Sequence, residues 1–318
     1  MDTQELFARA FKRVSFYARG VFLDSLRYSF YENRLKRLGP QIAEIERGGG
    51  ELADRVTYYN HMPRCEPAAD AQPISRIERR RSYYYFDLKI PAKHFGRARR
   101  INYIFGDLTT VPPEPALVKS RPIGGDNRNS VVFKLNQLRH FGLRVQTDRM
   151  SFRDKRPMAV WRGRLNNDKR RALIAHHYAH PSCDIGHTSV ESDTVSYKPF
   201  ISVREHLAHR FIISIEGRDV ATNLKWIMSS NSLCLMPKPR YETWFMEGRL
   251  KPGVHYVELR DDFADLTEKI SFYNDNQDEA EAIIAEANAF YRQFQDRHRE
   301  ELCMLAVLHK YFQQTGQL

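Results

Sequence analysis

The sequence predicts an α/β fold, and two features of the chain carry that prediction. After residue 157, short apolar runs that are typical of buried strands alternate with amphipathic segments that are typical of helices. This alternation indicates a parallel sheet covered by helices on both faces. The composition, with 42% apolar and 28% charged residues, is that of a globular chain and excludes wholesale disorder. The length of 318 residues predicts about two domains.

Residues 4–38 are predicted to form a helix, because apolar side chains recur there at steps of three and four residues. These apolar residues are Leu6, Phe7, Phe11, Val14, Tyr17, Val21, Phe22, Leu26 and Phe30. Basic residues fall largely between them, so the stretch could lie on a membrane surface. We favour packing against the protein's own core, the commoner arrangement for such a stripe. Glycine and proline at 39–40 and the glycines at 48–50 are expected to end this region.

The middle of the chain mixes short β-rich runs with proline and glycine turns. Residues 83–86 and 101–105 are predicted strands, and the proline-rich segment 111–115 ends the second. Four further strands are predicted at 158–161, 210–215, 232–236 and 255–259. Helices are predicted near 167–179, 202–208, 220–229 and 263–273, and helical segments continue through 276–315.

The formal net charge of +11 is not spread evenly along the chain. Segments 76–100 and 119–156 are rich in Arg and Lys, whereas 258–301 is acidic. This asymmetry favours a polyanionic partner such as nucleic acid, a phosphorylated glycolipid or an anionic membrane surface. A role in solubility alone, without a single partner, stays open.

Two features of the chain indicate where it resides. No run approaches the roughly 20 apolar residues that span a bilayer, so an integral membrane protein is not expected. The first residues are acidic and polar, where a secretory signal would be basic and then apolar. We therefore expect a cytoplasmic protein.

Candidate ligand-binding residues follow three of the predicted strands. Ligands of doubly wound sheets bind at the carboxyl ends of strands, where helix starts and backbone amides point outward. Guanidinium groups and a close-approaching glycine suit a diphosphate, and a carboxylate suits ribose hydroxyls. The candidates are Arg162, Gly163, Arg164 and Arg170 after the first strand, Glu216, Gly217, Arg218, Asn223 and Lys225 after the second, and Glu242 after the third.

Each of these turns taken alone is a weak signal, because a glycine turn with arginine is more often a solvated turn. The sequence has no GxGxxG after a strand and no GxxxxGK[ST], which disfavours ordinary dinucleotide-binding and P-loop proteins. The occurrence of all three turns at successive strand ends favours a nucleotide ligand.

Several runs of residues resemble glycosyltransferase family 90. They are Lys-Pro-Phe-Ile-Ser at 198–202, Ser-Ser-Asn-Ser at 229–232, Trp-Phe at 244–245, Leu-Lys-Pro-Gly-Val-His-Tyr-Val at 250–257 and Asp-Asp-Phe-Ala-Asp-Leu at 261–266. The family comprises capsule-associated and lipopolysaccharide core transferases of bacteria and the eukaryotic protein O-glucosyltransferases. The sequence is most similar to the bacterial lipopolysaccharide branch, and the resemblance runs from about 155 to 295.

The resemblance implies a GT-B-like fold, with two Rossmann-like lobes facing across a cleft, a helical N-terminal extension and a helical C-terminus. The corresponding divisions are a helical segment at 1–50, an acceptor-side lobe at 51–156 and a nucleotide-sugar-binding lobe with C-terminal helices at 157–318. It further implies an inverting, metal-independent transferase that uses a UDP-sugar. Arg162 and Gly163 match the turn facing the donor phosphates, and Arg170 matches an arginine that contacts the donor.

One position departs from the family pattern. Many eukaryotic relatives have an arginine where Asn223 stands, so the phosphate contact there is in doubt, and Lys225 or Arg218 is the expected substitute.

The segment 106–112, Gly-Asp-Leu-Thr-Thr-Val-Pro, resembles the part of eukaryotic members that supplies the catalytic base, which makes Asp107 the candidate base. A sugar hydroxyl must lose its proton as it attacks, and a carboxylate at a strand end can accept it. The alternative is that Asp107 caps the turn into the proline-rich loop. The competing carboxylates are Asp87, Asp126 and Asp148.

No metal or other cofactor is expected. The sequence has no DxD motif, so Arg, Lys and helix-start amides must stabilise the leaving diphosphate. His176, His177, His180, Cys183 and His187 have a spacing that zinc ligands also show, and we give this alternative little weight against the family resemblance.

The predicted function is transfer of a hexose from a UDP-sugar to the inner core of lipopolysaccharide or a related glycan of the bacterial cell envelope. The expected partners are a UDP-hexose and a phosphorylated glycolipid or oligosaccharide acceptor, with an anionic membrane surface possible and no nucleic acid. The expected location is cytoplasmic, with peripheral association to the inner face of the inner membrane possible. Two alternatives stay open: a nucleic-acid-binding protein that uses the basic, aromatic-rich N-terminal half, and an inactive homologue that binds a sugar nucleotide.

Overall fold

The computed structural model describes residues 3–80, 82–141, 148–189 and 195–318. The chain divides into two compact units. Unit 1 comprises Met1–Ala10, Leu143–Arg240 and Glu247–Gln293, and unit 2 comprises Phe11–Gly142, Tyr241–Met246 and Phe294–Leu318. How two lobes face each other in the GT-B arrangement stays a prediction.

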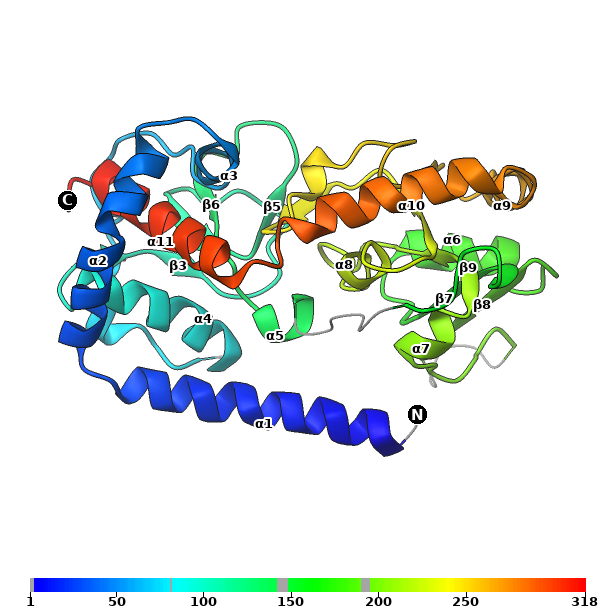
Figure 1. Ribbon diagram of the computed structural model, residues 1–318, viewed down its shortest axis with the longest axis horizontal. Helices are drawn as coiled ribbons and strands as arrows, with labels where there is room; N and C mark the ends of the chain where they lie inside the picture. The colour runs from blue at the N-terminus through cyan, green and yellow to red at the C-terminus, as the bar shows by residue number, and fades with distance from the viewer. Residues whose placement is uncertain (1–2, 81, 142–147, 190–194) are drawn as a thin grey trace. The chain divides into compact units, whose positions relative to one another are not determined.

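Unit 1 is built on a sheet whose described strands are all parallel, in the order β12-β10-β9-β7-β8. Figure 1 labels β7, β8 and β9 of this sheet. The strands are β7 (Arg156–Gly163), β8 (Cys183–His187), β9 (His209–Ile213), β10 (Leu233–Pro237) and β12 (Val257–Leu259). The predicted parallel sheet is therefore confirmed. Strand β8 was not predicted, because its sequence Cys-Asp-Ile-Gly-His has too few apolar residues to give a strand pattern.

Helices of unit 1 follow the strands in the alternation that the sequence predicts. They are α6 (Asp168–His177), α7 (Val203–His206), α8 (Leu224–Ile227), α9 (Leu266–Asp275) and α10 (Gln277–Arg292), with a short 3-10 turn at Glu247–Arg249. Ala159, Phe211 and Leu233 occupy one row of the sheet and share a core with α6, α9 and α10. Alternate residues such as Ile212 point to the other face and are equally buried. Both faces of the sheet are therefore covered.

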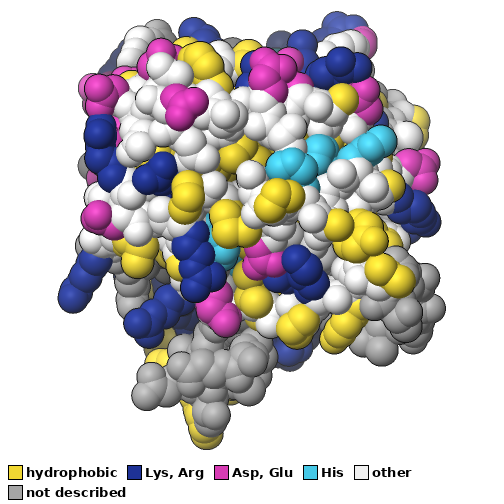
Figure 2. All heavy atoms as spheres, turned by 90° about the vertical axis from the view of Figure 1, so that its right-hand side faces the viewer, with side chains coloured by type: hydrophobic (Ala, Val, Ile, Leu, Met, Phe, Trp, Pro, Cys, Tyr) yellow, Lys and Arg dark blue, Asp and Glu magenta, His cyan; other side chains and the backbone are white. Residues whose placement is uncertain are grey.

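The surface of the molecule carries charges of both signs. On the face that Figure 2 presents, cationic and anionic side chains are interspersed, and histidine side chains gather in the upper part. Within the described residues, no group of three or more His, Cys, Asp or Glu side chains is placed to hold a metal ion. Among the same residues, no helix is both long enough and apolar enough to cross a membrane.

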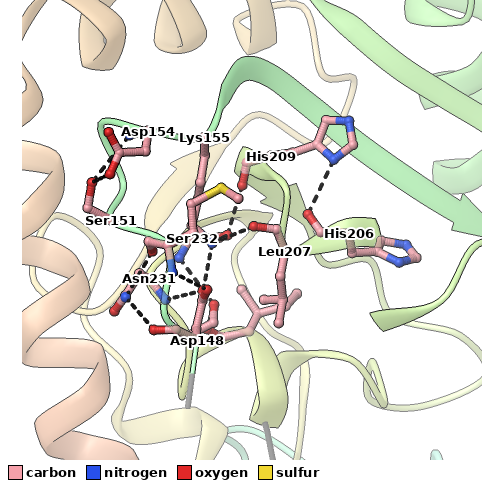
Figure 3. Close-up of polar contacts among 12 residues, drawn as sticks. Asp148, Ser151, Asp154, Lys155, His206, Leu207, His209, Asn231 and Ser232 are labelled. Atoms are coloured by element: carbon pink, nitrogen blue, oxygen red, sulfur yellow. Dashed lines mark hydrogen bonds and ion pairs between the residues drawn. The ribbon is translucent and has the colours of Figure 1, made fainter. Parts of the chain in front are cut away.

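The amino end of the unit 1 sheet is held by a buried ion pair, drawn in Figure 3. Lys155 Nζ, just before β7, donates to Asp148 Oδ2 at 2.6 Å, to the Leu207 carbonyl at 2.6 Å and to Ser232 Oγ at 2.9 Å. The Asn231 backbone N–H donates to the same Asp148 oxygen at 2.9 Å. We call these five residues the amino-end network. They join the segment before β7 to the turns that precede β9 and β10.

Unit 2 contains a parallel sheet of β3 (Tyr103–Ile104), β4 (Ala116–Val118) and β6 (Ser130–Val132). Two antiparallel pairs join β1 (Gln72–Pro73) to β2 (Arg100–Ile101) and β5 (Ser120–Pro122) to β11 (Tyr241–Thr243). The helices are α1 (Thr3–Ser25), whose first residues belong to unit 1, α2 (Tyr28–Glu46), α3 (Glu51–Tyr59), α4 (Ser82–Ala92), α5 (Gln137–His140) and α11 (Arg297–Gln314), with 3-10 turns at Ile74–Arg76 and Lys93–Phe95.

Glu300 on α11 connects the separate chain segments of unit 2. Its carboxylate accepts hydrogen bonds from Arg55 at 2.5 Å, Lys134 at 2.6 Å and the Trp244 indole at 2.7 Å. All four side chains are buried, and a buried charge is tolerated when it is paired and hydrogen-bonded. This cluster explains why residues 241–246 and the C-terminal helix belong to unit 2.

The predicted strand at 83–86 is wrong, since these residues lie in helix α4. Tyr84, Tyr85, Phe86 and Leu88 are all buried in unit 2. A short aromatic run has the same pattern in a buried strand as in a helix that is buried on every side. The predicted strand at 101–105 is found as two shorter strands, β2 and β3, in different sheets.

The predicted single helix at 4–38 is two helices that separate at residues 26–27, and Gly39 and Pro40 do not end the second. Lys93 Nζ donates to the carbonyls of Asp24 and Leu26, both at 2.6 Å, and so satisfies the end of α1. Helix α2 continues through Pro40 to Glu46. A proline inside a helix costs about 3 kcal/mol, yet α2 continues past it and packs against α11.

The expectation that the apolar side chains of residues 4–38 pack against the protein's own core is also wrong. Most of the residues that we expected to pack into the core are exposed in the structure. They are Phe7, Phe11, Val14, Val21, Phe22 and Phe30.

Candidate functional site

Three turns meet at the carboxyl end of the unit 1 sheet, because β7, β9 and β10 are adjacent parallel strands. We call the turns at 162–170, 214–218 and 238–240 the carboxyl edge. Arg162, Gly163, Arg164, Arg170, Glu216, Gly217 and Arg218 all lie on it. The structure therefore brings together most of the residues that the sequence singles out.

Arg170, on the first turn of α6, joins the turns after β7 and β9. Its guanidinium donates to the Arg164 carbonyl at 3.1 Å and to the Ile215 carbonyl at 3.0 Å, and it lies over the Trp161 ring. A Cβ atom at Gly217 would be 3.5 Å from Arg170 Nη2, so this turn passes close to the guanidinium. Arg170 thus fixes the separation of two turns.

Asn167 caps α6 and reaches the same neighbouring turn. Its side-chain oxygen accepts from the Arg170 backbone N–H at 3.0 Å, which is an N-cap hydrogen bond. Its amide group donates to the carbonyls of Glu216 at 2.8 Å and Gly217 at 3.0 Å. The start of α6, where amide groups favour an anion, is therefore held beside the turn after β9.

Glu216 links the second turn to the third. Its carboxylate accepts from the Arg240 backbone N–H at 2.8 Å and from Arg240 Nε at 3.2 Å.

Gly163 is required for packing, because a Cβ atom there would lie 2.6 Å from the Trp161 indole.

Arg162 is bound into the sheet. Its guanidinium donates to the Asp184 side chain at 2.7 Å, the Asp184 carbonyl at 2.7 Å and the Pro199 carbonyl at 3.2 Å, and its side chain is nearly buried. Lys198 also donates to Asp184, at 2.9 Å. Burial alone would raise the pKa of Asp184, but the hydrogen bonds from Lys198 and Arg162 lower it. These contacts hold the end of β7 against β8.

Asn223 and Lys225 are likewise occupied by internal contacts. The Asn223 amide donates to the Ile213 carbonyl at 3.0 Å and accepts from the Ser214 hydroxyl at 3.0 Å. Lys225 is buried and pairs with buried Glu247 at 2.5 Å. Both side chains support the end of β9 and helix α8.

Arg164, Arg218 and Lys238 differ from these residues. All three are exposed, one on each turn of the carboxyl edge. Within the described residues, none of their side chains has a hydrogen-bond or ion-pair partner. Three uncompensated cations on adjacent turns, beside a capped helix start, can bind a diphosphate.

Asp107 lies at the carboxyl end of the unit 2 sheet. It follows β3, and its carboxylate pairs with Lys119, which follows the adjacent strand β4. Burial raises the pKa of Tyr84, on which the charges of Lys119 and Asp107 also act, so the three groups lie close together. The Asp107 side chain is 33% exposed, whereas Lys119 is buried. Because it is partly exposed, the Asp107 carboxylate can be reached by an acceptor hydroxyl, whose proton it could accept.

The competing carboxylates have other environments. Asp126 is exposed and pairs with Arg128, whose hydrogen bonds lower the pKa of Asp126 to about 2. Asp148 belongs to the amino-end network. Burial raises the pKa of Asp87 to about 8, although Gln137 donates two hydrogen bonds to it.

Glu242, predicted to bind the donor, lies in unit 2 on β11. Its buried carboxylate accepts from Arg121 at 2.7 Å and from the Tyr58 hydroxyl. Asp107 and Glu242 thus belong to unit 2 and the other candidates to unit 1.

The sequence model of glycosyl transferase family 90 matches residues 131–315. The chain belongs to that family. The matched segment contains the whole carboxyl edge and begins after Asp107.

This family 90 chain is similar to proteins from a bacterium and from animals. It is 43% identical to a protein named O-glucosyltransferase LpsA from Dichelobacter nodosus, over 96% of each chain. It is 26% identical to Protein O-glucosyltransferase 3 of Homo sapiens over 51% of its length, and it covers 33% of that relative. For Protein O-glucosyltransferase 2 of Danio rerio the identity is 27% over 50% of its length, with 32% of the relative covered.

Sequence reasoning missed Asn167 in this family 90 site, and from the run 236–245 after the third strand it chose Glu242 as the donor-binding residue, not Lys238 or Arg240. Lys238 and Arg240 follow a predicted strand directly, so their position after β10 was available as a signal. Asn167 was available as an N-cap, since Asn stands immediately before the predicted helix. Their proximity to the other turns depends on the strand order, which the sequence pattern does not give.

Proposed function

We propose that this family 90 chain is a UDP-sugar-dependent hexosyltransferase that acts without a metal and inverts the anomeric carbon. The observation that carries the proposal is the carboxyl edge, where Arg164, Arg218 and Lys238 carry uncompensated positive charge beside the start of α6. A nucleoside diphosphate leaves with negative charge that must be stabilised, and fixed cations and amide groups can do so.

In the proposed mechanism the chain's own residues have two tasks. Arg164, Arg218 and Lys238 bind the donor diphosphate and stabilise the charge that develops as the glycosidic bond to it breaks. Arg170 holds the first two turns together, and Glu216 links the second turn to the third. Asp107 removes the proton of the acceptor hydroxyl as the new bond forms on the opposite face of the anomeric carbon. Lys119 pairs with Asp107 and holds its carboxylate in place.

The proposed acceptor is the inner core of lipopolysaccharide or a related surface glycan, met in the cytoplasm. Similarity to a protein named O-glucosyltransferase LpsA supports this class and favours glucose as the hexose. Nucleic-acid binding is not favoured, because the family consists of glycosyl transferases.

The test uses purified protein, a panel of UDP-sugars and EDTA. We expect UDP release and transfer to deacylated lipopolysaccharide, together with UDP-dependent thermal stabilisation. Asp107→Asn should lower kcat by about 10²- to 10⁴-fold and keep the stabilisation by UDP. Asp126→Asn is the matched control and should keep full activity.

Three outcomes would contradict parts of this proposal. Full activity of Asp107→Asn removes Asp107 as the base. A requirement for a divalent ion removes metal independence. Stabilisation by UDP without turnover of any donor indicates the inactive homologue.

A further inference from the structure

Within unit 2, one face of helix α1 packs against helix α4. Phe16 and Tyr17 each contact the Phe86 ring of α4, with 6.4 Å between ring centroids. A Cβ atom at Gly20 would lie 2.6 Å from the same ring, so the helices approach closely there. Near its end, Asp24 accepts a hydrogen bond from Tyr85 at 2.7 Å. Figure 1 shows α1 beside α4.

The opposite face of α1 is apolar and exposed. Phe11 is 74% exposed, Val14 65%, Val21 50% and Phe22 62%. At about 100° per residue, these four side chains lie within roughly 100° of the helix circumference, on the side away from Phe16 and Gly20. We call them the apolar stripe. Two exposed phenylalanines on one stripe are costly in water and mark an interaction surface.

Basic side chains border the apolar stripe on one side. Lys12 and Arg19 follow Phe22 around the helix, and both are exposed. From residue 6 to residue 23 the sequence contains no Asp or Glu. The surface is therefore apolar in the middle, positive along one edge and without acidic side chains.

We propose that the apolar stripe of α1 binds the surface of an anionic lipid bilayer, with the helix lying parallel to the membrane plane. The phenylalanines enter the boundary between headgroups and acyl chains, and the bordering cations contact lipid phosphates. A second copy of the chain is a poorer partner, because residues 6–23 carry Arg and Lys without any Asp or Glu, and two such helices packed together would repel each other. This inference goes beyond the transfer reaction and does not rest on it.

Vesicle sedimentation of the full chain tests the proposal. We expect it to sediment with vesicles of phosphatidylcholine and phosphatidylglycerol, and much less with phosphatidylcholine alone. Phe11→Ser and Phe22→Ser should each weaken binding by about tenfold. The matched control is Phe272→Ser on α9, which is 44% exposed and lies outside the stripe. It should bind like the wild type.

Substitution of the basic residues beside the stripe measures the electrostatic contribution to vesicle binding. Lys12→Gln with Arg19→Gln should weaken binding to the anionic vesicles by about fivefold per charge. Arg47→Gln with Arg297→Gln removes the same charge from exposed positions elsewhere and should have little effect. A Phe11→Trp variant should show a blue shift of its fluorescence when anionic vesicles are added.

Several results would overturn the proposal. They are no sedimentation with anionic vesicles, equal binding of the Phe11→Ser and wild-type proteins, and an unshifted Phe11→Trp spectrum. A dimer in solution that Phe22→Ser dissociates, without vesicle binding, would assign the stripe to a second copy. None of these readouts depends on transferase activity, so a failed transfer assay leaves them intact.

Discussion

The two ends of the unit 1 sheet differ in whether their basic side chains have partners within the protein. At the amino end, Lys155 has no exposed side-chain surface and its ammonium group donates three hydrogen bonds. At the carboxyl edge, Arg164, Arg218 and Lys238 are exposed and lack protein partners within the described residues. Lys155 therefore stabilises the fold at the amino end, whereas these three cations of the carboxyl edge are available to a ligand.

A basic residue at a strand end therefore indicates a ligand-binding site only when its side chain has no partner within the protein. A saturated buried cation contributes to stability, and removing it leaves its carboxylate partner unpaired. An exposed cation without a partner contributes little to stability and keeps its hydrogen-bonding capacity for a ligand. Stability and donor affinity should therefore respond to different substitutions.

The largest effect is expected at the amino end. Lys155→Met should lower the free energy of unfolding by about 3–5 kcal/mol, because Asp148 is left buried and unpaired. Urea denaturation measures this change. Adding Asp148→Asn should restore part of the loss. Lys251→Met, at an exposed position, is the control and should change stability by less than about 0.5 kcal/mol. Equal stability of the Lys155 and Lys251 variants would refute the contrast.

The next effect concerns the carboxyl edge. Arg218→Ala should lower kcat/KM for the UDP-sugar by roughly 10- to 100-fold, since a hydrogen bond between charged groups contributes about 1.5–3 kcal/mol. The urea midpoint should stay unchanged. Arg204→Ala, at an exposed position on α7, removes the same charge and should keep wild-type kinetics. A stability loss in Arg218→Ala with normal kinetics would reverse the assignment.

The smallest effect is a pH dependence near the amino end. Burial lowers the pKa of His206 to about 4 from 6.5. Between these values the unfolded chain binds more protons at this residue, so the free energy of unfolding should fall by about 1 kcal/mol per pH unit as the pH drops. His206→Phe should flatten this slope in urea titrations at several pH values. His176→Phe, on the exposed side of α6, should keep it; an unchanged slope in His206→Phe excludes His206 as the source.

Much of unit 1 could be predicted, because strands buried on both faces carry strong apolar runs, and helices α6 and α7 begin after the capping residues Asn167 and Ser202. The predicted strands and the parallel sheet were found, and the turns after β7 and β9 meet as expected. Unit 2 was harder. Residues 83–86 form a helix because burial on all sides removes the periodicity that distinguishes a helix from a strand, and the apolar stripe faces solvent although its pattern is that of a core helix.

For the site, residue types and local spacing were enough to predict the family, the positions of the turns and the cations on them. They do not show which of these cations are paired inside the protein, because that depends on contacts between distant parts of the chain. Arg162 and Lys225 meet carboxylates that are 22 positions away in sequence, and Glu242 meets an arginine 121 positions away. Whether residues so far apart in sequence form an ion pair depends on strand order and burial. A local sequence pattern shows neither.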